Sequence, residues 1–300
     1  MRLAAFLLLA TAAFPQRHVT QGRAQTITEN LYKCPETVNN HRIAAVGRIT
    51  ATDGAVLTVP AQTAYPARPT ADLYNECAPR NLAPLKPVII DPDGELITAH
   101  IVADNYFELY VNGTLVATDN TPYTPFNSAI VQFRAKRPLT SAFKLVDWEE
   151  NLGLGTELMR GDPWYPGDGG LIARFSDGTV TDHTWRAQSF YIAPLNTPSD
   201  VTEKPGNIHD TSALGRVHPH AKKPPCQDKC FAVHYPIPAN WASPNFNPQW
   251  PAAVEYTDEE VGVTNLPAYT KFPNHFQGAR WIWSSNLVFD NLVFIRKTVP

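Results

Sequence analysis

The dipeptide Asn112-Gly113 constrains the fold of this chain more than any other feature of its sequence. It separates two β-prone runs, residues 106–111 (YFELYV) and 114–116 (TLV), and the first run alternates Tyr and Glu with apolar residues. Asn and Gly tolerate the positive φ angles of a type I′ turn, so this dipeptide between β-prone runs is a strong hairpin signal. The sequence therefore predicts an antiparallel hairpin and, around it, an antiparallel β fold.

The rest of the chain has the turn signals and short β-prone runs that are typical of an all-β protein. Turn dipeptides recur at 53–54, 93–94 and 177–178, long amphipathic helical periodicity is absent, and Pro (28 residues) outnumbers Gly (16). Short β-prone runs between turn signals are typical of a β-sandwich. Residues 25–90 look largely irregular. Strands are predicted at 42–49, 88–90, 95–102, 107–111, 114–117, 129–134, 142–146, 170–175, 189–192, 231–235 and 292–297.

Three segments carry a resemblance to a known family. They are the hairpin at 103–116 (ADNYFELYVNGTLV), a tryptophan segment at 241–251 (WASPNFNPQWP), and 279–283 (ARWIW) followed by 294–298 (FIRKT). Together they are similar to galactose-binding-domain-like β-sandwiches, including accessory modules of bacterial rhamnosidases and other glycosidases. The resemblance implies an antiparallel jelly-roll-type β-sandwich with long Pro-rich loops and a sugar-binding tendency, and it implies no catalytic residues.

The order of these segments departs from the family. In the glycosidase modules the tryptophan segments usually precede the hairpin, whereas here they follow it. We therefore expect a rearranged single sandwich or a second partial module packed on the first. The resemblance also implies that Trp241, Trp250, Trp281 and Trp283 are framework residues. Trp281 and Trp283 are two positions apart and share one face of a strand, so we interpret them as core.

The two ends of the chain and its charge give further expectations. Residues 1–13 are predicted to be a secretory signal, with Arg2 before a short apolar run that is too brief for a membrane span of about 20 residues. The galactose-binding-like sandwich region is expected over 25–300, with a linker at 196–230. A net charge of −3 without a basic stripe gives no argument for nucleic-acid binding. The sequence leaves the oligomeric state open.

Four cysteines form an even set, which in an exported chain predicts two disulfides. Proximity in the sequence favours the pairs Cys34–Cys77 and Cys226–Cys230. The alternative is a metal site made with His209, His218 and His220, but the spacing does not match a standard structural zinc site.

The strongest candidate binding site lies in the 147–168 segment, where aromatic, acidic and amide residues occur in Gly- and Pro-rich loops. Ring faces pack on the C–H patches of sugars, while carboxylates and amides bind sugar hydroxyls. The alternative is that the rings serve packing and the acids are merely solvated. A structural Ca²⁺ held by the same acids is a further hypothesis, although no ligand spacing defines one. The predicted ligand-binding residues are Trp148, Glu149, Glu150, Asn151, Trp164, Tyr165 and Asp168.

These observations lead to one prediction of function and two alternatives. The first is an exported, non-catalytic carbohydrate-binding protein of the cell surface or extracellular matrix. The second is a polysaccharide-acting enzyme whose acid pair comes from the 147–168 loops or from Asp258, Glu259 and Glu260. The third is a structural or adhesive protein that assembles without binding glycan. An open acidic cleft would favour the enzyme, a flat aromatic platform the glycan-binding protein, and a large apolar patch the assembly protein.

Overall fold

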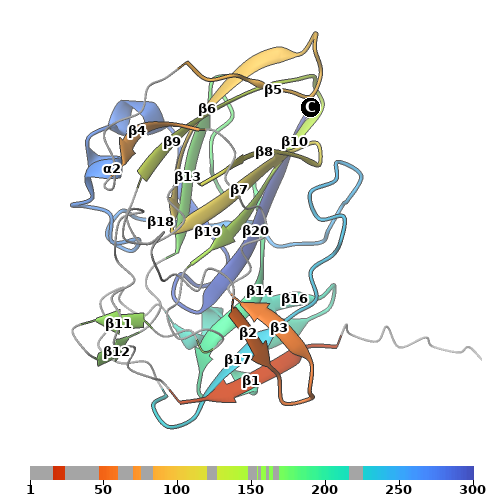
Figure 1. The fold of residues 1–300 in the computed structure, drawn as a ribbon, viewed down its shortest axis with the longest axis vertical. Helices are drawn as coiled ribbons and strands as arrows, with labels where there is room; N and C mark the ends of the chain where they lie inside the picture. Colours follow the sequence, from red (N-terminus) through yellow and green to blue (C-terminus); the bar gives the residue numbers. More distant parts are fainter. Residues whose placement is uncertain are drawn as a thin grey trace, which may run out of the picture.

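In a computed structural model the protein is dominated by two sheets, each with seven strands in the described part of the chain (Figure 1). The structure describes residues 16–23, 47–59, 70–75, 84–119, 127–147, 154, 157–159, 162–164, 169–215 and 226–300. The first sheet has the order β1 (His18–Gly22), β17 (Cys230–His234), β14 (Arg186–Leu195), β20 (Asp290–Val299), β10 (Leu139–Val146), β7 (Tyr106–Val111) and β8 (Thr114–Thr118).

The second sheet is also antiparallel, apart from one short strand. Its order is β18 (Val254–Tyr256), β19 (Trp281–Trp283), β13 (Gly170–Phe175), β6 (Glu95–Asp104), β9 (Asn127–Ala135) and β4 (Ala71–Asn75), and β5 (Val88–Ile89) pairs with β9 in parallel. Three two-stranded pairs are formed by β2 (Gly47–Thr50) with β3 (Val56–Val59), β11 (Glu157–Met159) with β12 (Asp162–Trp164), and β15 (Thr202–Lys204) with β16 (Ile208–Asp210). The helical turns are η1 (Pro198–Asp200), η2 (Ser212–Leu214), α2 (Pro267–Thr270) and η3 (Pro273–Phe276).

One buried apolar cluster lies between the two sheets. A chain of ring contacts crosses it, from Phe107 on β7 to Phe143 on β10, then to Trp185, and on to Phe175 on β13 and Phe133 on β9, with centroid distances of 5.9–6.4 Å. Edge and offset contacts at these distances are favourable for aromatic rings. The prediction of an all-β class is therefore confirmed, and the fold is sandwich-like.

The predicted hairpin is present. Val111 pairs with Thr114 across a two-residue turn, and both central residues have positive φ, 49° at Asn112 and 81° at Gly113. These are the signs that a type I′ turn requires, because its twist matches that of the flanking strands. The hairpin joins β7 to β8 at one edge of the first sheet.

The tryptophan pair at 281 and 283 is part of the core, as predicted. Trp281 is 1% exposed and Trp283 0%. Gly169 and Gly170 allow the backbone to approach these two rings, since a Cβ on Gly169 would stand 2.5 Å from the Trp283 ring. The indole nitrogen of Trp283 donates to the carbonyl of Asp290 at 2.9 Å, so the ring is also fixed in orientation.

Most predicted strands are present, and several are longer than expected. The prediction at 170–175 coincides with β13, while β6, β9, β10, β14 and β20 extend beyond their predicted ends. The expectation that 25–90 is largely irregular missed β3 and β4. Within the predicted linker, β15 and β16 form a hairpin beside β14, where Gln188 donates to the carbonyl of Asn207 at 3.2 Å.

The predicted disulfide between Cys226 and Cys230 is formed, with the two Cα atoms 5.1 Å apart. Cys34 and Cys77 lie outside the described residues, so their pairing stays a prediction. None of the helices in the described ranges has the length and apolar character to cross a membrane.

Candidate functional site

The predicted sugar site at 147–168 lies almost wholly outside the described residues. This holds for Trp148, Glu149, Glu150, Asn151, Tyr165 and Asp168. The backbone of Trp164 pairs with Glu157 between β12 and β11, and its side chain lies outside what the structure describes. Asp147, which begins the segment, is buried at the end of β10, where its N–H donates to the carbonyl of Asn291 at 2.8 Å.

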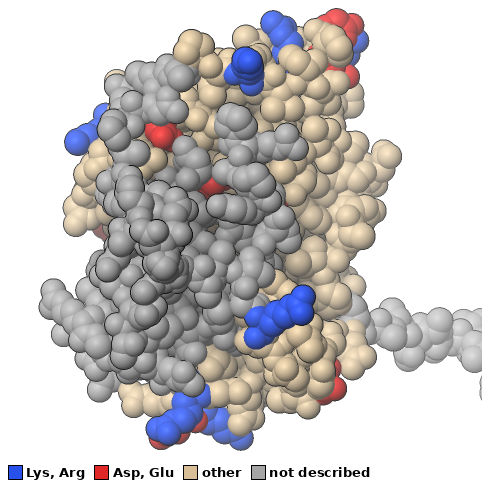
Figure 2. Space-filling model, viewed as in Figure 1, with Lys and Arg blue, Asp and Glu red and all other residues tan. Residues whose placement is uncertain are grey.

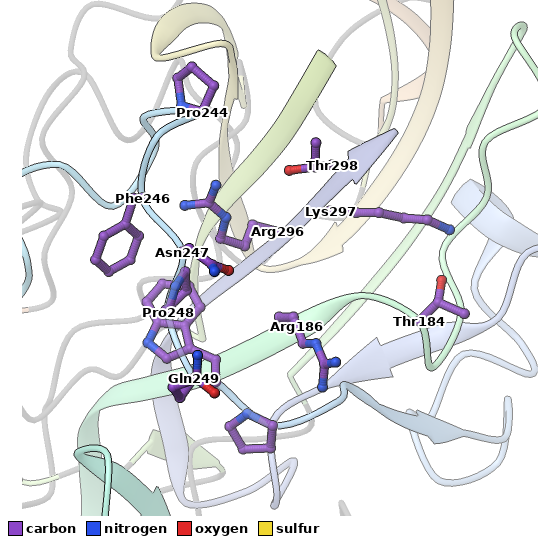
Figure 3. A pocket seen from close by; sticks show the side chains of 12 residues that line it. Thr184, Arg186, Pro244, Phe246, Asn247, Pro248, Gln249, Arg296, Lys297 and Thr298 are labelled. Atoms are coloured by element: carbon purple, nitrogen blue, oxygen red, sulfur yellow. The ribbon is translucent and has the colours of Figure 1, made fainter. Parts of the chain in front are cut away.

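A different site is formed on the outer face of the first sheet, where the 241–251 segment crosses β14 and β20. It is a cavity of about 700 Å³, which we call the cationic groove (Figure 3). The described lining residues carry three cations and neither Asp nor Glu. They are Thr184, Arg186, Pro244, Phe246, Asn247, Pro248, Gln249, Trp250, Pro251, Arg296, Lys297 and Thr298.

Strand register places two arginines beside each other in this groove. Arg186 on β14 stands directly opposite Arg296 on β20, so both side chains leave the same face of the sheet. Like charges directly opposite on neighbouring strands are destabilising. Figure 3 shows the guanidinium of Arg296 directed toward Phe246 and that of Arg186 directed away from it. The divergence relieves part of the repulsion and leaves Arg186 available to a ligand.

Arg296 is held by neutral groups of the chain. Its guanidinium donates to the carbonyl oxygens of Trp241 at 2.8 Å and Ser243 at 3.0 Å, and it lies 5.4 Å from the centre of the Phe246 ring. The residue is only 4% exposed, and burial lowers the pKa of its guanidinium below its ordinary value. No carboxylate of the described residues pairs with it, so its charge adds to the positive potential of the groove.

The 241–251 segment is pinned by its own turns and by its rings. Backbone hydrogen bonds run from Ser243 to Asn240 and from Phe246 to Ser243, in a stretch whose prolines disfavour a strand. Trp241 packs edge-on against Tyr110 and Phe294 of the sheet, at 5.0 and 4.4 Å. The framework role predicted for Trp241 and Trp250 agrees with this packing, because Trp250 is buried against Phe190 and Trp241 is partly buried.

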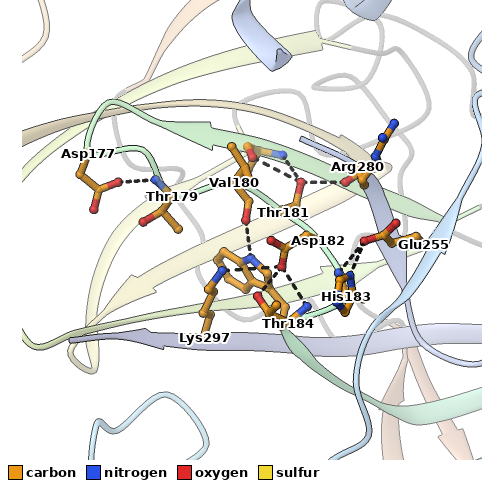
Figure 4. A network of polar contacts seen from close by, with 12 residues as sticks. Asp177, Thr179, Val180, Thr181, Asp182, His183, Thr184, Glu255, Arg280 and Lys297 are labelled. Atoms are coloured by element: carbon orange, nitrogen blue, oxygen red, sulfur yellow. Dashed lines mark hydrogen bonds and ion pairs between the residues drawn. The ribbon is translucent and has the colours of Figure 1, made fainter. Parts of the chain in front are cut away.

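Lys297 and Thr184 form the far side of the groove (Figure 3), and both contact Asp182 (Figure 4). The Lys297 ammonium lies 3.6 Å from the nearer carboxylate oxygen of Asp182, and Thr184 donates to the same carboxylate from its N–H, at 2.9 Å, and from its hydroxyl. Partial burial acts to raise the pKa of Asp182, but the Thr184 hydrogen bonds and Lys297 lower it overall. Asp182 therefore stays ionised and offsets part of the Lys297 charge, whereas Arg186 has no acid partner in the described part of the chain.

The alternative catalytic acid pair at 258–260 includes side chains that stabilise the local structure. A carboxylate oxygen of Glu260 accepts the N–H of Thr257 at 2.8 Å, while the Thr257 hydroxyl accepts the N–H of Glu260 at 3.2 Å. This reciprocal pairing is that of a capping box. Asp258 accepts the Tyr269 hydroxyl at 3.1 Å. The side chains of Glu260 and Asp258 thus organise a turn.

The metal hypotheses rest on residues that the structure describes only in part. Cys226 and Cys230 are joined in the disulfide, so neither is a thiolate ligand. His218 and His220 lie outside the described residues, and His209 donates from Nδ1 to the carbonyl of Ser189 at 2.7 Å. Among the residues that are described, no group of three His, Cys, Asp or Glu side chains is arranged to hold a metal ion.

Figure 2 shows one face of the molecule, on which the described Lys and Arg side chains lie at several separate places, some of them beside acidic side chains. They form no continuous basic stripe on the described part of that face. Comparison of the chain with protein-family models, with curated protein sequences and with solved structures finds no match.

The basic residues of the groove were not predicted as a site from the sequence. Arg296 and Lys297 were assigned only to a framework strand by the resemblance, and Arg186 precedes a predicted strand. One signal was available, since the 241–251 segment combines three Asn or Gln residues with two Trp and one Phe. Amides and rings together are typical of sugar sites, but the strands that this segment crosses are not evident from the sequence.

Proposed function

We propose that the protein binds carbohydrate without catalysis, and that it prefers glycans that carry acidic groups. The observation that carries this proposal is the lining of the cationic groove, in which three cations and no described acid stand beside rings, amides and hydroxyls. The chain has a net charge of −3, yet it places several cations in one cavity. The positive potential of that cavity favours the binding of an anion.

Each group in the groove has a use in binding such a ligand. The exposed guanidinium of Arg186 can bind a carboxylate or sulfate in bidentate geometry. Asn247 and Gln249 are exposed amides that can both donate to and accept from sugar hydroxyls. The partly exposed ring of Phe246 offers an apolar surface for sugar C–H groups. A volume of about 700 Å³ lies within the range of small-ligand sites.

The similarity to galactose-binding-like modules supports the proposal, because one of the three similar segments, 241–251, forms one side of the groove. With the predicted secretory signal at 1–13, we propose that the protein acts at a cell surface or in an extracellular matrix. The predicted residues at 148–168 remain a competing location for the same activity.

Binding of the secreted protein to an array of neutral, uronic-acid-containing and sulfated oligosaccharides tests the proposal. We expect acidic oligosaccharides to bind best and their affinity to fall as NaCl rises from about 50 to 500 mM. Arg186→Gln should weaken binding about tenfold or more, whereas Arg48→Gln, an exposed arginine outside the groove, should not change it. If no glycan binds, the proposed function is wrong. If Trp148→Ala abolishes binding and Arg186→Gln does not, the site is at the 148–168 loops.

A further inference from the structure

A second cavity lies next to the cationic groove and shares Pro251 with it. It has a volume of about 410 Å³ and lies beside β14, so we call it the β14 pocket. Its apolar wall includes Ile208, Ala252 and Val254, and its polar wall includes Gln188, His209 and Ser285. This mixture of an apolar wall and a few polar groups is typical of small-molecule sites.

Gln188 presents an acceptor that the described residues leave unused. Its side chain is 1% exposed, and its amide nitrogen donates to the carbonyl of Asn207 at 3.2 Å. Its amide oxygen is buried and has no hydrogen-bond partner among the described residues. Exchanging oxygen and nitrogen would direct the oxygen at the carbonyls of Asn207 and Ser189, so the assignment is fixed by the network. A buried acceptor without a donor has lost its hydrogen bonds to water without compensation, so a ligand hydroxyl that donates to this oxygen would be favoured.

His209 presents a second acceptor. Its Nδ1 lies 2.7 Å from the carbonyl of Ser189, and because a carbonyl only accepts, Nδ1 must carry the proton. Burial lowers the pKa of His209 to about 4, so the ring is neutral at pH 7 and Nε2 keeps a lone pair. The ring is stacked on Tyr235 and meets Phe190 edge-on, which fixes its orientation.

The serines of the same wall add no free donor. The hydroxyls of Ser284 and Ser285 donate to one carboxylate oxygen of the buried Asp290, at 2.7 and 3.2 Å. Each hydroxyl has a single proton, and Ser285 Oγ already accepts the N–H of Thr211 at 3.0 Å, so neither serine has a proton left to donate to a ligand. At the rim, Lys204 and Asp210 pair with each other. The inner wall of the β14 pocket thus offers two open acceptors, the Gln188 amide oxygen and His209 Nε2, with Lys204 as a donor at the rim, and this wall suits a neutral ligand that brings its own hydroxyl protons.

We infer that the β14 pocket binds a neutral pyranose unit, with two neighbouring hydroxyls donating to the Gln188 amide oxygen and to His209 Nε2. The C–H side of the sugar would pack on Ile208, Ala252 and Val254. The inference rests on the carbohydrate function proposed above and deepens it. The groove would hold an acidic unit and the pocket a neutral one, on either side of Pro251.

Titration of the protein with neutral methyl pyranosides, followed by ligand-observed NMR and calorimetry, tests this inference. We expect one epimer to bind, and Gln188→Met to weaken it about tenfold or more. The matched control is Gln132→Met, since Gln132 is also a strand glutamine whose amide nitrogen donates a hydrogen bond, and it lies outside the pocket. A deoxy analogue that lacks one of the two hydroxyls should bind more weakly and lose little more in Gln188→Met.

A second measurement requires no substitution and so does not depend on folding of a variant. The ¹⁵N resonance of His209 Nε2 should shift on titration of the wild-type protein with the methyl pyranoside, and should not shift with an analogue that lacks the donating hydroxyl. If acidic oligosaccharides bind but no neutral pyranoside does, or if Gln188→Met binds as well as wild type, the inference is overturned and the groove function stands. If neither class of sugar binds, the proposed function fails with it.

Discussion

Two buried cations lie on the same face of the first sheet, and the chain surrounds them differently. Lys144 on β10 and Arg296 on β20 are 3% and 4% exposed. Lys144 pairs with Phe294 across the ladder, and Phe294 is two residues from Arg296, so both side chains point outward from the sheet. Lys144 is paired with a carboxylate, whereas Arg296 is bound by carbonyls and by a ring.

The Lys144 site is closed. Its ammonium lies 3.5 Å from a carboxylate oxygen of Glu108, directly opposite on β7, and that carboxylate also accepts the hydroxyls of Tyr106 and Tyr110. Burial raises the pKa of Tyr110 and of Tyr106, and the Glu108 charge adds to both shifts, so both hydroxyls keep their protons to donate. The charges cancel within the protein, and nothing is left for a ligand.

The Arg296 site is open on one side. Its charge is solvated by neutral carbonyls, the Arg186 guanidinium stands opposite on the next strand, and the cavity of the groove lies over both. Burial of a cation is therefore not by itself a sign of function. A cation indicates a ligand site where the chain leaves its charge uncompensated next to a cavity.

The largest expected change in stability comes from a substitution at the Lys144 site. Glu108→Gln should reduce the free energy of unfolding by about 3–5 kcal/mol, because it leaves the buried Lys144 ammonium without its carboxylate. Urea denaturation of the variant and of wild type measures the difference. The double variant Glu108→Gln with Lys144→Met should recover at least half of the loss, since it removes the stranded charge. A cost below about 1 kcal/mol for the single variant would show that the pair is not the compensation we describe.

A second prediction concerns buried bases that lose their charge instead of pairing it. Burial lowers the pKa of His234 to about 3, with a further contribution from His18, and that of His209 to about 4. Both rings are neutral in the folded protein, so their contribution to stability is present above pH 6.5 and is lost as pH falls toward 4. The upper limit for the stability that each ring loses between pH 6.5 and 4 is about 3.5 kcal/mol, at about 1.4 kcal/mol per pH unit.

Stability measured by denaturation at pH 7 and pH 4 checks this prediction. His234→Gln should lose about 2–3 kcal/mol less than wild type on acidification. Asp290 acts in the opposite direction, because burial raises its pKa to about 6 and its protonation stabilises the fold as pH falls. That contribution is common to both proteins and cancels in the comparison. Equal losses in the two proteins would mean that His234 is protonated in the fold or that another group controls acid unfolding.

The smallest expected effects separate the two arginines. Arg296→Met should cost about 1.5–3 kcal/mol, because it removes charged hydrogen bonds to the carbonyls of Trp241 and Ser243. Arg186→Met should change stability by less than about 0.5 kcal/mol, since that side chain is exposed. Thermal and urea unfolding of both variants test the contrast. If both cost the same, the distinction between a structural arginine and a ligand-binding one is lost.

The parts of the fold that were predicted correctly depend on local chemistry. Asn112-Gly113 sets its turn through backbone preferences that need no partner, and β13 is bounded by turn signals on both sides. The strands that were missed have weak local signals. β4 is the short run ADLYN, and β3 is a four-residue run that alternates exposed and less exposed side chains. Their pairing with β9 and β2 supplies the stability that their own sequences do not.

The candidate site could not be predicted in the same way. From the sequence, the binding site was predicted at the acidic and aromatic residues of 147–168, and the amide-rich segment at 241–251 was interpreted as framework. Arg186 and Arg296 lie on strands far apart in the chain, and only the register between β14 and β20 sets them opposite each other. A single-residue slip in that register would move one arginine to the other face of the sheet.

The sequence by itself determined the β class, the type I′ hairpin, the tryptophan pair of the core and the Cys226–Cys230 bridge. Each follows from interactions between residues close in the chain or from the alternation of side chains along one strand. Tertiary structure alone decided which basic residues share a cavity, which cation receives a carboxylate, and which buried acceptors remain open. The physical reason is that charge compensation and cavity formation depend on distances between strands, and packing of the whole sheet sets those distances.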